Sequence, residues 1–241
     1  MRYLINFSYD GSKFYGYQKQ KEKETVQEKL ESVLSNINNS SVSVVSSGRT
    51  DKGVHANNAY AHFDLNNYID TNKLKKVLNS CSSHIYVKNI QVISNNFHAR
   101  FDVKKKEYIY IINIGTYNPI EKDYVYQYNK YLNICKMRKG LTYLKGKHDF
   151  KSFTKSNKDI INYTREIYKC KIKREKNYII ISFLGNGFLR YMIRNMIGVL
   201  IEIGENKLNP KEIKNIILAR DRCHAKKTAP SQGLYLNKVF Y

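Results

Sequence analysis

The segment RYLINFSY, residues 2–9, alternates apolar with other side chains at the period of a strand that buries one face. TVQEKLESVLSNINN, residues 25–39, then changes to the period of a helix. Thr25 with Glu28 three residues later has the pattern of a capping box, which marks the start of that helix. Its apolar stripe consists of Leu30, Val33, Leu34 and Ile37.

The rest of the first half adds strands and one short helix to this beginning. Strands are expected at SVSVVS, AYAHFDL and HIYVKNIQVI, which are residues 41–46, 59–65 and 84–93. The helix expected before the last strand carries Leu74, Val77, Leu78 and Cys81 on one side.

A similar series begins again after residue 104. It opens with the strand EYIYIINIG, residues 107–115, and closes with GLYLNKVFY, residues 233–241. Because hairpins replace regular strand–helix alternation, we predict an α+β fold of two halves, 1–104 and 105–241, whose mainly antiparallel sheets join and leave a cleft between them. The elements expected between are a helix near 131–145, a hairpin of 165–174 with 177–185, a long buried helix at 187–204 and a helix at 209–221.

Charge and composition point to a nucleic-acid partner. The 241 residues contain 42 Lys and Arg against 20 Asp and Glu, a net charge of +22 that attracts phosphate backbones over long range. The alternative is that the lysines follow nucleotide bias in the encoding genome and form only a solvated surface. Without an apolar membrane span or signal peptide in the sequence, we expect a cytoplasmic protein. The scattered cysteines Cys81, Cys135, Cys170 and Cys223 lack the spacing of a zinc or redox site, so we expect them to be reduced.

The common chemical motifs are missing from the sequence. It has no phosphate-binding glycine loop ending in Gly-Lys-Ser/Thr, no dinucleotide fingerprint, no His-Glu-x-x-His and no serine nucleophile elbow. The remaining candidate for chemistry is SGRTDKGVHA, residues 47–56, in which Asp51 stands between Arg49 and Lys52. If residues 49–51 are extended, Arg49 and Asp51 share one side, and positive charge keeps the carboxylate ionised for work as a nucleophile or base. The alternative is a surface turn whose ion pair contributes about 0–1 kcal/mol.

Two further groups of side chains are candidates. Arg190 and Arg194, four residues apart, are expected on one face of the buried helix, where like charges need an anion, unless both reach solvent. Tyr108 and Tyr110 follow a run of lysines, so their rings could stack on bases, unless they belong to the core.

These segments together resemble the TruA family of tRNA pseudouridine synthases over nearly the full length. The shared motifs occur in the family's order: YDGSKFYGYQKQ with TVQEKLE, GRTDKGVHA, FHARF, KEYIYII, KHDFKSF, GFLRYMIRNMIGVLIEIG and AKKTAPSQGLYL. The resemblance implies that Asp51 is the catalytic aspartate, that Arg49 enters the RNA stem and holds the flipped uridine, that Tyr108 packs on the base, and that Arg194 pairs with the carboxylate.

The resemblance also implies a fold and a reaction. The fold is two ferredoxin-like halves that form one mixed, mainly antiparallel sheet around a basic cleft. The reaction isomerises uridine to pseudouridine at positions 38, 39 and 40 of the tRNA anticodon stem-loop, by a homodimer, with no cofactor and no metal. Two positions depart from the family pattern: Tyr17 stands where tryptophan is common, and Lys52 where many bacterial members have alanine.

Two other classes of protein remain as alternatives. A non-catalytic RNA-binding protein would use the same basic surface and aromatic rings without needing Asp51. A metal-dependent nuclease would need more carboxylates beside Asp51, and Asp10 and Asp64 are the nearest candidates along the chain.

Overall fold

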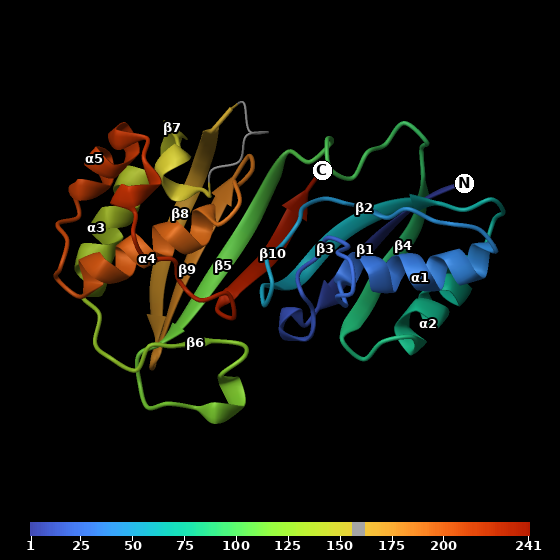
Figure 1. The fold of residues 1–241 in the computed structure, drawn as a ribbon, viewed down its shortest axis with the longest axis horizontal. Helices are drawn as coiled ribbons and strands as arrows, with labels where there is room; N and C mark the ends of the chain where they lie inside the picture. Colours follow the sequence, from blue (N-terminus) through green and yellow to red (C-terminus); the bar gives the residue numbers. More distant parts are fainter. Residues whose placement is uncertain (156–161) are drawn as a thin grey trace. The chain divides into compact units, whose positions relative to one another are not determined.

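The predicted first strand forms β1 (Arg2–Tyr9), which pairs antiparallel with β3 (His55–Asp64) on one side and with β4 (Ile85–Ile93) on the other. The computed structural model describes residues 1–155 and 162–241 and divides them into two units, drawn in Figure 1. The first unit comprises Met1–Lys104 with Tyr235–Tyr241, and the second comprises Lys105–Leu234.

The first unit has the element order of a ferredoxin-like β-α-β-β-α-β motif. Its helices α1 (Val26–Asn38) and α2 (Thr71–Ser80) follow β1 and β3, and the short β2 (Val45–Ser46) pairs with β3. The last strand, β10 (Leu234–Phe240), runs parallel to β3 through Tyr235 and Leu236. The core of this unit includes side chains from both helices and from strands β1, β3 and β4, among them Tyr3, Ile5, Phe7, Leu30, Leu34, Phe63, Leu74, Leu78 and Val87.

Helix α1 begins as the sequence predicts, and its own side chains explain why the strand after it is short. Thr25 caps the helix, its Oγ1 accepting a hydrogen bond of 3.3 Å from the Glu28 N–H. The predicted strand 41–46 is reduced to Val45–Ser46. The N–H groups of Val42 and Val44 donate to Ser35 Oγ and Glu31 Oε1 of α1, so they are not available to a neighbouring strand.

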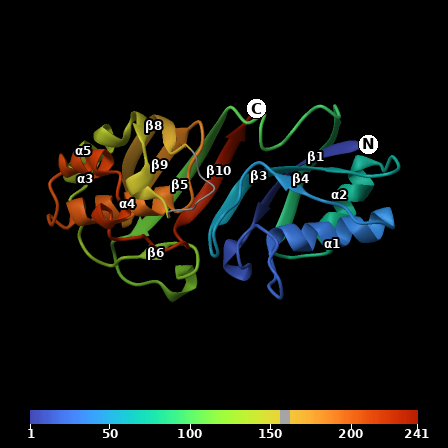
Figure 2. The same ribbon diagram turned by 45° about the horizontal axis from the view of Figure 1, so that its top comes forward.

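The second unit is an antiparallel sheet with three helices beside it, which Figure 2 shows together. Its strand order is β5-β9-β8-β7, and the short β6 pairs parallel with β5. The helices are α3 (Ile134–Leu144), α4 (Met192–Gly204) and α5 (Glu212–Ala219). The strands are β5 (Lys105–Asn113), β6 (Tyr126–Gln127), β7 (Gly146–Asp149), β8 (Thr164–Glu175) and β9 (Tyr178–Gly185). Short 3-10 turns complete the chain: η1 (Gly11–Lys13), η2 (Pro119–Glu121), η3 (Lys151–Phe153) and η4 (Arg222–His224).

The α+β class is therefore confirmed, while two further details differ from the sequence prediction. Residues 235–241, predicted to belong to the second half, lie in the first unit because β10 pairs with β3. The buried helix begins at Met192 and not at residue 187, because Tyr191 adopts a left-handed backbone conformation with φ of 62°.

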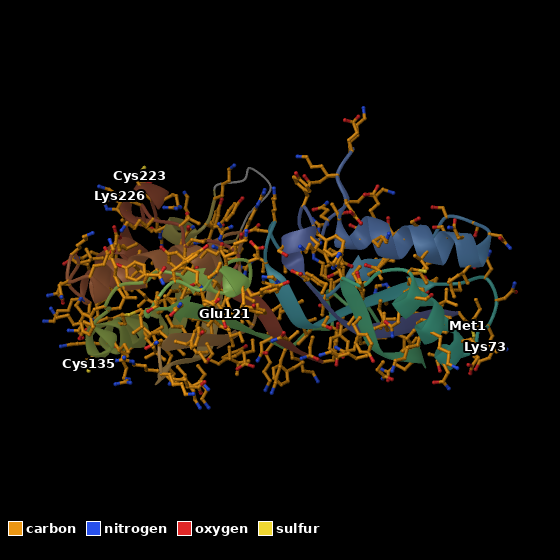
Figure 3. The ribbon with its side chains drawn as sticks, turned by 90° about the horizontal axis from the view of Figure 1, so that it is seen from below. Met1, Lys73, Glu121, Cys135, Cys223 and Lys226 are labelled. Atoms are coloured by element: carbon orange, nitrogen blue, oxygen red, sulfur yellow. The ribbon has the colours of Figure 1, made fainter. Side chains whose placement is uncertain are left out.

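Two expected features of the chain can be compared directly with the structure. Its cysteines Cys81, Cys135, Cys170 and Cys223, all within the described residues, are free thiols, and Figure 3 labels two of them on the second unit. None of the described helices has the length and apolar character needed to cross a membrane.

We expect the carboxylate that ends α4 to make stability depend on acid pH. Glu205 accepts a hydrogen bond of 2.5 Å from the Tyr128 hydroxyl, and Lys207 and Lys227 lie 2.9 and 3.3 Å from it. The Tyr128 hydrogen bond, followed by the two lysines, lowers the pKa of Glu205 to about 2. A lowered folded-state pKa contributes stability that is present above the ordinary value of 4.5 and is lost as pH falls toward 2.

Urea denaturation at a series of pH values should show this loss in the wild type. Glu205→Gln should remove that part of the pH dependence, and Tyr128→Phe should remove some of it, because the largest cause of the lowered pKa is gone. Identical pH profiles for the wild type and Glu205→Gln would contradict the assignment.

Candidate functional site

The candidate aspartate lies in the loop between β2 and β3. The Val54 N–H donates to the Asp51 carbonyl at 3.1 Å, and Gly53 has φ of 77°, so the chain turns sharply just after the carboxylate. Asp51 is half-buried and Arg49 is exposed. The residues therefore lie outside any regular strand, as the glycines in the sequence predict.

The segment after β1 holds the backbone of this loop. The Tyr9 hydroxyl and Thr50 Oγ1 share a hydrogen bond of 2.8 Å, and the Tyr17 N–H donates to the Thr50 carbonyl at 3.1 Å. Gly16, with φ of 96°, fits closely against the loop, because a Cβ there would lie 3.0 Å from the Thr50 carbonyl oxygen and 3.2 Å from the Lys52 nitrogen. The peptide groups on both sides of Asp51 are thus in contact with one rigid turn.

Serines at the start of the loop fix its other end. Ser46 Oγ donates to the Gly48 carbonyl at 2.5 Å and accepts from the Gly48 N–H at 3.0 Å. The Ser47 N–H donates to the Tyr60 carbonyl of β3 at 2.7 Å. Between these anchors and Thr50, Arg49 is left with its side chain exposed to solvent.

An aromatic contact that the sequence analysis missed holds one of the cations of this loop. The Lys52 ammonium lies 4.0 Å from the centroid of the Tyr15 ring, and Lys23 lies 5.4 Å from the same ring. Lys52 follows Asp51 directly in the loop, and the Tyr15 ring holds its ammonium group in place. The signal in the sequence was FYGYQ, where an aromatic ring stands beside the glycine that contacts the loop.

The carboxylates proposed for a nuclease have structural partners of their own. Asp10 Oδ1 accepts from the Ser12 N–H at 3.0 Å and lies 3.4 Å from His55 Nδ1, while Asp64 forms a bidentate pair with Arg2. Within residues 1–155 and 162–241, no three His, Cys, Asp or Glu side chains are grouped as a metal site would require.

The predicted stacking residue lies on β5 of the second unit. Tyr108 is 8% exposed, and its ring meets Phe188 edge to face with centroids 5.3 Å apart. Tyr110 is fully buried and donates its hydroxyl to the Pro230 carbonyl at 2.8 Å. Tyr110 is therefore a core residue, which is the alternative that the sequence left open for it.

The two candidate arginines, Arg190 and Arg194, are arranged differently from the prediction. Arg190 precedes α4, so the expected shared helical face for Arg190 and Arg194 is wrong: the left-handed Tyr191 separates them. Both guanidinium carbons instead lie near the Tyr191 ring, 5.2 and 5.1 Å from its centroid. Arg194 also donates from Nε to the Ala229 carbonyl at 2.8 Å, so its side chain is oriented by a contact within the second unit.

A buried amide, also missed in the sequence, holds α4 against the segment 225–230. Asn195 donates to the Phe153 carbonyl at 2.6 Å and accepts from Thr228 Oγ1 at 2.7 Å and from Arg222 at 3.0 Å. Gly198 permits this packing, because a Cβ there would lie 2.2 Å from the Lys227 carbonyl oxygen. A single amide in a helix made mostly of apolar residues was the available sequence signal.

Asp51 and Arg49 thus belong to the first unit, and Tyr108 and Arg194 to the second. The pairing of Asp51 with Arg194 and the central cleft remain predictions. Each unit by itself holds its candidate residues on backbone that is fixed by hydrogen bonds.

Comparisons with known proteins agree with the resemblance seen in the sequence. A family model described as tRNA pseudouridine synthase matches residues 5–102 and 141–241. The tRNA pseudouridine synthase A of Limosilactobacillus reuteri (strain DSM 20016) is 38% identical over 100% of this chain and 96% of its own. The proteins of the same name from Clostridium acetobutylicum and Mycoplasmoides gallisepticum are 38% and 40% identical, over 98% and 99% of this chain and 98% and 90% of their own.

We expect Gly16→Ala to disturb the aspartate loop. The new methyl group would press on the peptide groups of Thr50 and Lys52 while the backbone keeps a φ that side chains disfavour, at a cost of about 1–3 kcal/mol in the free energy of unfolding. Gly187→Ala is the control, since its Cβ would meet nothing closer than 3.8 Å. Thermal unfolding of both variants measures the difference, and equal stability of the two would contradict the close packing described for Gly16.

Proposed function

Because the chain belongs to the tRNA pseudouridine synthase family, we propose that it converts uridine to pseudouridine in the tRNA anticodon stem-loop, at positions 38, 39 and 40, with Asp51 as the reacting carboxylate. Membership of this family makes the chain an isomerase that acts on tRNA, which removes the non-catalytic alternative. The observation that carries the proposal for Asp51 is the fixed backbone on both sides of it, at Thr50 and Lys52.

A uridine in a stem must leave the helix before any side chain can reach its sugar. Extrusion costs a few kcal/mol of stacking and pairing, so the enzyme has to provide contacts that replace them. Arg49 is exposed on the aspartate loop, where it can enter the space left in the stem. Tyr108, from the second unit, would pack on the flipped base.

The reaction rearranges bonds without adding or removing atoms. The bond between ribose C1′ and N1 of the base breaks, the base turns, a bond forms between C1′ and C5, and the C5 proton leaves while N1 regains a proton. Asp51 begins the sequence either by attack on C1′ or by removal of the C2′ proton. Both routes need an ionised carboxylate that is aimed before substrate arrives, because preorganised groups lose little energy in reorganisation.

Positively charged groups near the aspartate loop would favour the ionised form of the Asp51 carboxylate. Lys52 is held over Tyr15 beside the loop, and Arg194 would pair with the carboxylate from the second unit. The chain would act as a homodimer, with its basic surface holding tRNA phosphates. The net charge of +22 and the nitrogen-tipped side chains on both units in Figure 3 support that surface.

Release of tritium from tRNA labelled at uridine C5 tests the proposal, because the C5 proton is lost only when the new bond forms. The wild type should release tritium without added metal. Asp51→Asn, which keeps the shape of the side chain, should lose on the order of 10⁴-fold or more in rate, as expected when a nucleophile is removed.

Binding of unmodified tRNA by the same variant is the control. It should stay within a few-fold of the wild type, since Asp51 acts in chemistry and not in holding phosphates. Undiminished release by Asp51→Asn would overturn the role of Asp51. Sequencing of the product tRNA tests the three positions, and modification outside the anticodon stem-loop would overturn that part.

A further inference from the structure

The turn after β4 presents the most exposed aromatic ring among the described residues. Phe101 is 74% exposed, in the FHARF motif that the proposed chemistry does not use. Single exposed apolar side chains are common on proteins and need no explanation by themselves. Phe101 differs because the turn that carries it is held rigidly from several directions.

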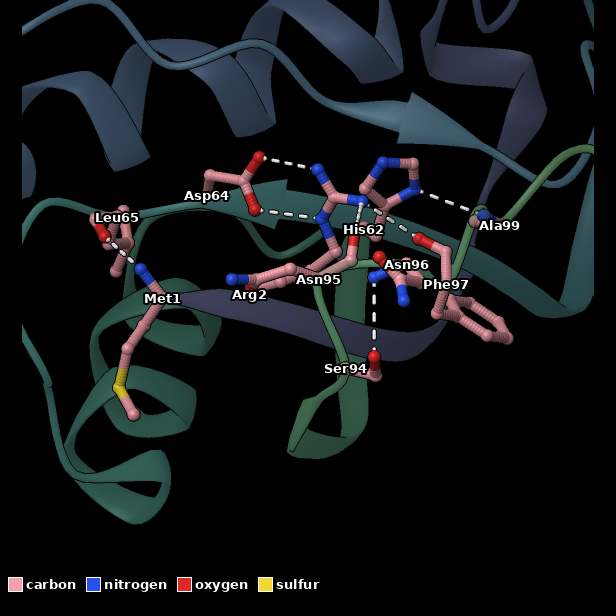
Figure 4. Close-up of polar contacts among 10 residues, drawn as sticks. All are labelled: Met1, Arg2, His62, Asp64, Leu65, Ser94, Asn95, Asn96, Phe97 and Ala99. Carbon is pink, nitrogen blue, oxygen red and sulfur yellow. Dashed lines mark hydrogen bonds and ion pairs between the residues drawn. The ribbon is translucent and has the colours of Figure 1, made fainter.

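Arg2 of β1 anchors the start of the turn, as Figure 4 shows. Its Nη1 donates to the carbonyls of Asn95 and Phe97 at 2.5 and 2.9 Å, while Nε and Nη2 each lie 2.8 Å from an oxygen of Asp64. A guanidinium pair of this bidentate kind fixes direction as well as distance. The chain entering the turn is therefore attached to both β1 and β3.

The middle of the turn is attached to β3 and to the last residue of the chain. The Ala99 N–H donates to His62 Nδ1 at 3.1 Å (Figure 4). The Tyr241 hydroxyl donates to the Ala99 carbonyl at 2.9 Å. Burial lowers the pKa of His62 to about 4, so the ring stays neutral and keeps accepting this hydrogen bond at physiological pH. Both polar groups of the Ala99 backbone are thereby satisfied, and the residue is fully buried.

His98 supports Phe101 from beneath. The His98 N–H donates to Asp102 at 2.8 Å, and its Nδ1 accepts from the N–H groups of Arg100 and Phe101 at 3.2 and 3.3 Å. These bonds set the plane of the imidazole, and the Phe101 ring lies stacked on it with centroids 4.2 Å apart and planes 26° apart. His98 covers one face of Phe101, and the residue as a whole remains 74% exposed.

The charge beside the ring is positive. Arg100 is exposed, with its guanidinium carbon 5.8 Å from the Phe101 centroid, and Lys104 is exposed two residues after Asp102. The Asp102 carboxylate is turned back to the His98 backbone. A largely exposed aromatic ring with a guanidinium near it is the combination that binds unpaired bases and their phosphates.

We propose that Phe101 is a stacking platform for an unpaired base of the tRNA, and that Arg100 contacts a phosphate next to that base. The proposal rests on tRNA being the substrate. A second copy of the chain is a less suitable occupant, because charged residues are depleted at the centres of protein interfaces, whereas Phe101 stands among the exposed charged residues Arg100, Asp102 and Lys104 in the sequence.

Affinity for unmodified tRNA tests the platform. Phe101→Ala should raise Kd by about 5- to 150-fold, the range for loss of one base–aromatic stack, and Phe101→Trp should stay within about 2-fold of the wild type. Tritium release at subsaturating tRNA should fall in Phe101→Ala by about the same factor as the affinity, because the ring acts by binding the substrate. Tyr68→Ala is the matched control, since Tyr68 is 63% exposed in the same unit and should leave Kd unchanged.

Salt dependence tests the part assigned to Arg100. Arg100→Gln should weaken binding and reduce the slope of log Kd against log salt by about 0.7–0.9, the amount for one phosphate contact. An unchanged slope would overturn that contact.

The outcomes separate this proposal from the proposed function. Wild-type Kd in Phe101→Ala, with normal tritium release by the wild type, would overturn the platform alone. A smaller oligomer for Phe101→Ala in sedimentation, with tRNA affinity retained, would identify a second copy as the occupant and also overturn it. Absence of tritium release by the wild type would overturn the proposed function, while the Kd comparison would still decide the platform.

Discussion

The hydrogen bonds of Thr50 are the constraint on which the candidate site depends. Its hydroxyl meets Tyr9, and its carbonyl meets the Tyr17 N–H, so the residue before Asp51 is tied to the segment that leaves β1. Gly16 closes against the same peptide groups. A carboxylate on a flexible loop would have to be ordered each time substrate binds. In this loop the backbone is already ordered by folding, so substrate binding does not have to supply that conformational entropy.

In the second unit, a buried amide fixes the backbone near the candidate residue Arg194. Asn195 uses its donor and its acceptor to join α4, Phe153 and Thr228, and the tight packing at Gly198 brings the segment 225–230 onto the helix. This packing places the Ala229 carbonyl beside Arg194, and the hydrogen bond from Arg194 Nε to that carbonyl orients the guanidinium. A buried polar group is stabilising only when all its hydrogen bonds are made, so the position of this segment is strongly specified.

Charge and rigid aromatic rings together suit the chain to a nucleic acid. Long-range attraction by the excess of 22 positive charges carries no geometry, and it cannot distinguish one RNA segment from another. Position is given by rings and cations on fixed supports, such as Lys52 over Tyr15 and Phe101 over His98. The first supports the proposed reaction, and the second supports the proposed contact away from it.

Local pattern in the sequence was enough to predict the α+β class, β1, the Thr25 cap of α1 and Asp51 as the candidate residue, because each depends on neighbours a few residues away. The tertiary structure decided what depends on distant partners. The long helix starts only at Met192, after the left-handed Tyr191, and β10 belongs to the first unit. Side chains of α1 accept the hydrogen bonds of the Val42 and Val44 N–H groups. The turn that carries Phe101 likewise depends on a distant partner, because Arg2 donates hydrogen bonds to the carbonyls of residues 95 and 97. Periodicity in the sequence indicates which face of a helix or strand is buried, but it does not indicate which distant residues pack against that face.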